Sequence, residues 1–187
     1  QASDCLTDTN YREFYMNYDK LEDKDGFQKL RELVENIYTN EYLGKLLPKW
    51  NEGLAEQDAL SVIPLQREFF NKYVKNNKER TIVIISDGMR YEVGRELYAK
   101  LSDNPKSKVS LQAVLSVLPS YTRLGMEALL PHKKLELTDD FKELVDGKYA
   151  VDLATRQQVL QEYVPHSCCV KYDDIKDYTG MVLREIF

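Results

Sequence analysis

The spacing of the hydrophobic positions changes near residue 80, and this change divides the chain into two parts. Over residues 1–78, apolar side chains recur three and four positions apart, which is typical of helices that turn one face to a core. From residue 79 onward, short apolar runs alternate with such helical stripes, which predicts strands followed by helices. We therefore predict an N-terminal helical region over 1–78 and an α/β sheet region over 79–187.

Three helices are predicted in the first part. Aromatic residues at helical spacing favour one over residues 1–22, and an apolar stripe favours a second from Phe27 to about Pro48. Pro64 permits a third, because proline is tolerated in a first helical turn. The aromatic face of the first helix lacks interleaved arginine and lysine, so it is interpreted as core rather than as a stacking platform for bases.

Two strand candidates frame the second part. Thr81–Ile85 is short, apolar and β-branched, which is typical of a strand buried on both faces, and Val109–Leu118 is the second candidate. The stripe from Met89 to Leu101 predicts a crossover helix, so the two strands would lie parallel in one sheet. Further helical stripes are predicted at residues 124–130, 153–163 and 181–187.

Composition and charge narrow the class of protein. A chain of 187 residues with 43% hydrophobic and 30% charged residues has enough apolar material for a buried core. Its net charge of -5 argues against sequence-independent binding of nucleic acid over a wide surface. Neither a membrane-spanning stretch nor a secretory signal is present, which favours a cytoplasmic protein. The spacing of Cys5, Cys168 and Cys169 matches no structural zinc or redox motif and indicates free thiols.

Candidate chemistry lies at the ends of the two predicted strands. Asp87 follows the first strand, and Ser120 and Thr122 follow the second at a strand-to-helix turn. Ligands of open α/β sheets bind at the carboxyl ends of strands, and a hydroxyl there is placed to meet a phosphate. Serine and threonine are also the preferred N-caps of helices, which is the structural alternative. A hydroxyl nucleophile requires a neighbouring base or metal, so Asp87 with one hydroxyl suits a metal-assisted site.

Other phosphate-handling classes lack their motifs. The chain contains no G-x-G-x-x-G and no G-x-x-x-x-G-K-[ST], which argues against dinucleotide-binding and P-loop folds. His132 and His166 are the only histidines, and they support no Ser-His-Asp triad. A receiver-like domain with Asp87 as phosphate acceptor is a further alternative.

Two longer segments surround these residues, Ile85–Gly94 (ISDGMRYEVG) and Leu118–Met126 (LPSYTRLGM). Together they resemble the PglZ family of the alkaline phosphatase superfamily. This family is the component of bacterial bacteriophage exclusion (BREX) systems to which a phosphatase role is ascribed. The similarity continues through Ala128–His132, Val145–Lys148 and Thr155–Gln157, with a weaker match at Asn36–Leu43.

The resemblance implies an alkaline-phosphatase-like α/β fold with a divalent-metal site, usually of two zinc ions. It makes Asp87 a metal ligand, and it makes Thr122 both a ligand and the nucleophile that is transiently phosphorylated. Ser120 is the alternative nucleophile, and Arg90 is a candidate for a phosphate contact or a structural pairing. Gly88 stands where the family leads us to expect alanine.

The resemblance also implies further ligands, an Asp and His set on later strands, which we expect beyond Phe187. His132 and His166 do not match that set. Because the chain begins at Gln1 and stops directly after the amphipathic run Met181–Phe187, we expect a fragment truncated at its C-terminus. An incomplete ligand shell binds metal weakly, so we expect this piece to be inactive.

The function implied is that of a metal-dependent phosphatase or phosphodiesterase of a bacterial antiphage defence system. Its expected partners are the other components of that system, and its expected substrate is a phosphate ester, with nucleic acid as one candidate. The alternative is a non-catalytic interaction module of the defence complex, which would hold no tightly bound zinc.

Overall fold

The computed structural model describes residues 2–55 and 63–186, which fold as two compact units. The first unit joins Gln1–Ile63 to Gly88–Ala113, and the second joins Pro64–Asp87 to Val114–Phe187. The division expected from sequence, between residues 78 and 79, stays a prediction. Within the described ranges no helix combines the length and the apolar character needed to cross a membrane.

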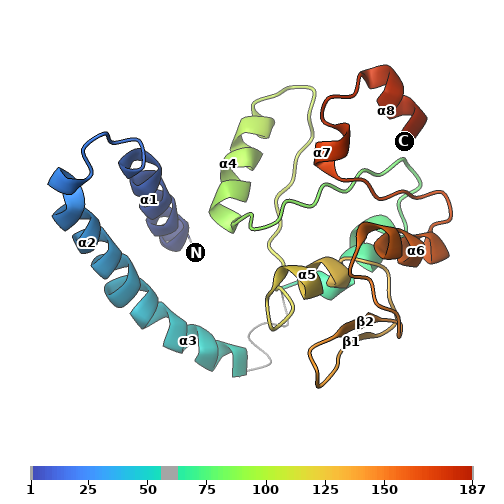
Figure 1. Cartoon of the computed structure of the whole chain (residues 1–187), viewed down its shortest axis with the longest axis horizontal. Helices are drawn as coiled ribbons and strands as arrows, with labels where there is room; N and C mark the ends of the chain where they lie inside the picture. The colour runs from blue at the N-terminus through green and yellow to red at the C-terminus, as the bar shows by residue number, and fades with distance from the viewer. Residues whose placement is uncertain (1, 56–62, 187) are drawn as a thin grey trace. The chain divides into compact units, whose positions relative to one another are not determined.

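The first unit is helical, as its apolar spacing predicts. The stripe that begins at Phe27 continues past Pro48, which lies inside a helix instead of ending one. Two helices and a π-helical segment follow one another without a break in this stretch (Figure 1). The elements are α1 Ala2–Tyr18, a 3-10 helix Asp25–Phe27, α2 Gln28–Asn36, the π-helical segment Ile37–Leu43, α3 Gly44–Ala55 and α4 Tyr91–Ser102.

The aromatic face of α1 packs inside this unit. The ring of Tyr11 stacks on the ring of Tyr38 with centroids 3.7 Å apart. The Tyr38 hydroxyl donates to the Asp8 carboxylate at 2.7 Å. The pKa of Tyr38 rises to about 12. Burial is the larger cause of this rise, and the hydrogen bond to Asp8 is the next. These contacts agree with the interpretation of the aromatic face as core.

The prediction of strands at Thr81–Ile85 and Val109–Leu118 is wrong for the described chain. Both segments lie outside any strand, and only Leu115 forms a parallel bridge, with Leu65. A strand requires a neighbouring backbone to pair with, and an apolar composition does not supply one. Ile82 and Ile84 are accordingly 63% and 87% exposed.

The second unit is mixed α/β around a small antiparallel sheet. Strands β1 (Leu135–Leu137) and β2 (Glu143–Val145) pair with Leu135 opposite Val145. A core of Val145, Ala150 and Val159 is covered by Leu130 and Leu135. The remaining elements are a 3-10 helix Gln66–Glu68, a π-helical segment Phe70–Val74, α5 Thr122–Ala128, α6 Leu153–Tyr163, α7 Tyr172–Ile175 and α8 Gly180–Ile186.

Candidate functional site

Asp87 and Thr122 meet within the second unit. The Thr122 Oγ1 atom lies 3.3 Å from each of the two carboxylate oxygens of Asp87, so the hydroxyl donates to both. Both side chains are exposed, which leaves them accessible to a ligand. The structure thus brings together the two residues selected from sequence, although the strands that motivated their selection are not formed.

The Thr122 hydroxyl does not cap the helix that it begins. Tyr121 is the N-cap residue of α5, and its side chain makes no capping hydrogen bond. Thr122 is the first helical residue, and its hydroxyl turns to Asp87. Ser120, the alternative nucleophile, is exposed two residues before the helix. Arg90 belongs to the first unit, where its charge acts on Tyr11 and Tyr38.

Gln66 holds α5 and the segment before it together. Its side-chain amide donates to the Gly125 carbonyl at 2.9 Å, and its Oε1 accepts the Val117 N–H at 3.1 Å. Its backbone N–H also donates to the Leu115 carbonyl at 2.8 Å. Gln66 therefore fixes the chain on both sides of Thr122, and its side chain acts from more than fifty positions away.

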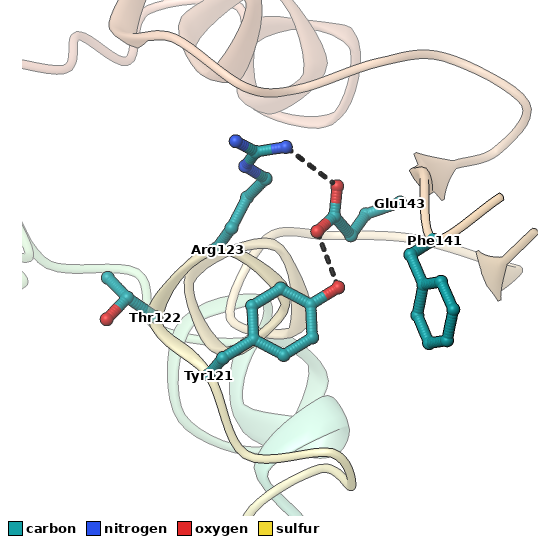
Figure 2. Close-up of a pocket in the computed structure, with 5 residues that line it drawn as sticks. All are labelled: Tyr121, Thr122, Arg123, Phe141 and Glu143. Atoms are coloured by element: carbon teal, nitrogen blue, oxygen red, sulfur yellow. Dashed lines mark hydrogen bonds and ion pairs between the residues drawn. The ribbon is translucent and has the colours of Figure 1, made fainter.

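A pocket of about 470 Å³ opens beside Thr122, lined by Tyr121, Thr122, Arg123, Phe141 and Glu143 (Figure 2). Glu143 on β2 is only 1% exposed, and its carboxylate accepts the Tyr121 O–H at 2.5 Å. The Arg123 guanidinium lies 3.5 Å from the other oxygen of Glu143. One buried carboxylate therefore orients the two side chains that flank Thr122 in sequence.

These contacts shift the pKa values of both Tyr121 and Glu143. The hydrogen bond to Glu143 is the main reason that the pKa of Tyr121 rises to about 12. Burial acts to raise the pKa of Glu143, but the Tyr121 hydrogen bond and the Arg123 charge outweigh it, so this pKa falls below its ordinary value. Glu143 is therefore a carboxylate, and Tyr121 a protonated phenol, at neutral pH.

A second glutamate of this unit is also buried. Glu127 on α5 is 0% exposed, and neither of its carboxylate oxygens has a hydrogen-bond partner among the described residues. Burial, followed by the negative charge of Glu143, raises the pKa of Glu127. The side of α5 that faces the protein interior thus carries an unsatisfied acidic group.

The donor atoms at this site fit one side of a metal centre. A carboxylate and a hydroxyl oxygen are suitable ligands for a divalent ion, and Asp87 and Thr122 place such oxygens together. No group of three metal-ligating side chains occurs within the ranges that the structure describes. The Nδ1 atom of His132 lies 2.7 Å from the Leu130 carbonyl, and His166 is exposed. Asp87 and Thr122 are two oxygen donors, fewer than the four ligands that a zinc ion takes in proteins.

Comparison with known proteins identifies a family and two relatives. The family described as "BREX system PglZ alkaline phosphatase-like domain" matches residues 65–187. An alkaline phosphatase-like protein PglZ of Bacillus cereus (strain H3081.97) is 38% identical, over 96% of this chain and 22% of the relative. An alkaline phosphatase-like protein BrxZ of Escherichia coli O9:H4 (strain HS) is 36% identical, over 85% of this chain and 20% of the relative.

The chain therefore spans about a fifth of the length of these curated relatives. No solved structure matches it.

Proposed function

Because the chain belongs to the PglZ family of BREX-system alkaline phosphatase-like domains, we propose that it carries the nucleophile of a metal-dependent phosphate-ester hydrolase of phage defence. The observation that supports this proposal is the contact of the Thr122 hydroxyl with both carboxylate oxygens of Asp87. A hydroxyl nucleophile requires a neighbouring group that holds its proton. The contact at 3.3 Å is long for an O–H···O bond, as is common in catalytic groups that tighten only on a substrate.

In the proposed reaction, the Thr122 oxygen forms a bond to phosphorus while the ester oxygen departs as the alcohol. Asp87 accepts the proton of the Thr122 hydroxyl and passes it to the departing ester oxygen. Water then attacks the phosphothreonine, releases phosphate, or the remaining monoester where the substrate is a diester, and restores the hydroxyl. A divalent ion, zinc by the family resemblance, would be held by Asp87 and Thr122 and would stabilise the alkoxide form of Thr122.

The same proposal extends to the whole protein that contains this chain. Its substrate would be a phosphate ester, with nucleic acid as a candidate, and its partners would be the other components of the defence system. The remaining ligands of the metal would come from outside the described residues.

Metal content and hydrolysis of bis(p-nitrophenyl) phosphate test the proposal in the full-length protein. We expect the wild-type protein to hold stoichiometric zinc, and Asp87→Ala to lose both zinc and activity. Asp173→Ala is the matched control, because Asp173 is an exposed aspartate of α7 outside the site. A wild-type protein without bound metal or hydrolysis would contradict the proposal and favour a non-catalytic interaction module.

A further inference from the structure

Phe141 departs from the usual sequence of a hairpin turn. The loop between β1 and β2 is closed by hydrogen bonds from the Phe141 N–H to the Thr138 carbonyl and from the Thr138 N–H to the Lys142 carbonyl, both at 2.9 Å. This is the pattern of a three-residue loop whose last residue adopts the left-handed conformation. Phe141 has a φ of 57°, at a position ordinarily taken by glycine.

The strain at Phe141 is not offset by burial of its ring. A bulky side chain at positive φ is a backbone outlier. The ring is nevertheless 72% exposed, so the described chain gains little hydrophobic stabilisation from it. A residue that breaks a local rule without a structural gain points to a functional constraint.

The position of Phe141 suggests what that constraint is. Phe141 lines the same pocket as Thr122 and Tyr121, and Glu143 accepts a hydrogen bond from the Tyr121 hydroxyl (Figure 2). Arg123 also lines the pocket, and its side chain is 54% exposed. Its guanidinium lies 3.5 Å from the Glu143 carboxylate. Its guanidinium therefore retains N–H groups for a second, anionic partner.

We propose that Phe141 and Tyr121 form a stacking subsite beside Thr122 for the aromatic base of a nucleotide-type phosphate ester, with Arg123 on its phosphate. Exposed aromatic rings bind bases because every base presents a flat π-face, and arginine matches phosphate oxygens in pairs. The pocket volume of about 470 Å³ lies within the range of small-molecule sites. Glu143 acts as a positioning residue, since its buried carboxylate orients both Tyr121 and Arg123.

Two ligands that differ only in the base test this inference in the full-length protein. Dissociation constants of adenosine 5′-monophosphate and ribose 5-phosphate are measured by calorimetry. We expect the wild-type protein to bind the nucleotide roughly tenfold more tightly. Phe141→Gly should bring the ratio of the two dissociation constants close to one. Phe141→Trp should keep this ratio at its wild-type value. Arg123→Gln should weaken both ligands by similar factors, because the phosphate group that Arg123 would contact is common to the two ligands.

Tyr172→Gly is the matched control, because Tyr172 is 76% exposed and lies outside the pocket lining. The ratio should stay at its wild-type value in this variant. Phe141→Gly should also keep or raise the melting temperature, since glycine relieves the left-handed strain. A ratio unchanged by Phe141→Gly would overturn the inference. A melting temperature lowered by several degrees would do the same, because it would show that the ring packs in the fold.

This inference rests on the proposed function, but the two fail differently. Hydrolysis of phosphate esters without any preference for the base would contradict the proposed stacking subsite but not the proposed hydrolase activity. If the protein prefers the ligand with the base through Phe141 but hydrolyses no ester, the proposed hydrolase activity is contradicted and the stacking subsite is supported.

Discussion

Replacing Glu127 by glutamine should stabilise the chain at neutral pH. Glu127 is fully buried and its two carboxylate oxygens lack hydrogen-bond partners among the described residues. Burial and the negative charge of Glu143 raise its pKa, against the opposing charges of Arg156 and Arg123. The folded state therefore favours the protonated form. The contribution of Glu127 to stability is complete below its unfolded pKa and is lost as the pH rises through its folded pKa.

The magnitude follows from the cost of an unsatisfied buried group. A buried polar group without a partner costs about 1–3 kcal/mol. Glutamine keeps the shape of the side chain, cannot ionise, and offers an N–H donor near the Glu143 carboxylate. We expect Glu127→Gln to raise the free energy of unfolding at neutral pH by roughly 1–3 kcal/mol, or about 2–12 °C for a chain of this size.

Urea and thermal unfolding at about pH 4 and about pH 7.5 measure this effect. The difference between Glu127→Gln and the wild-type chain should be largest at the higher pH and should shrink toward the lower one. Glu52→Gln, at an exposed glutamate of α3, is the control and should show neither change. A loss of stability in Glu127→Gln at the higher pH would refute the reasoning, because it would show that the ionised carboxylate is stabilised in the fold.

Two further predictions concern the pocket and the core. Tyr121 should titrate near pH 12, and Glu143→Gln should return its pKa toward 10.0, as followed by spectrophotometric titration against Tyr121→Phe. An unchanged titration in Glu143→Gln would argue against the hydrogen bond. Val159→Ala, at a core residue that is 4% exposed, should lower the free energy of unfolding in urea by about 1–3 kcal/mol. Val151→Ala, at a residue that is 43% exposed, should change it by less than about 0.5 kcal/mol, and equal effects would contradict the assigned core.

Helices of this chain follow from its sequence because their signal is local. Spacings of three and four predicted the segments that form α1, α4 and α6. Strand pairing depends on a partner elsewhere, so the apolar run Thr81–Ile85 predicted a strand that the described chain does not pair. Conversely, β1 and β2 have three residues each, too few to show alternation in the sequence.

The candidate site was predictable only in part. Asp87 and Thr122 could be selected because each follows an apolar run, and the family resemblance strengthened that choice. Glu143 carries no local signal, because the register of the hairpin and not its neighbours in sequence brings it to Tyr121. Gln66 was missed for the same reason, since its contacts reach Val117 and Gly125.

Hydrolysis of bis(p-nitrophenyl) phosphate by nucleophile variants of the full-length protein tests the central claim most directly. Thr122→Ala should lower kcat by at least roughly a thousandfold, because it removes the atom that bonds to phosphorus in the proposed reaction. Ser120→Ala should retain most of the wild-type kcat, since Thr122 and not Ser120 donates to Asp87 among the described hydrogen bonds. Retained hydrolysis in Thr122→Ala, together with its loss in Ser120→Ala, would contradict the assignment of Thr122 as the nucleophile.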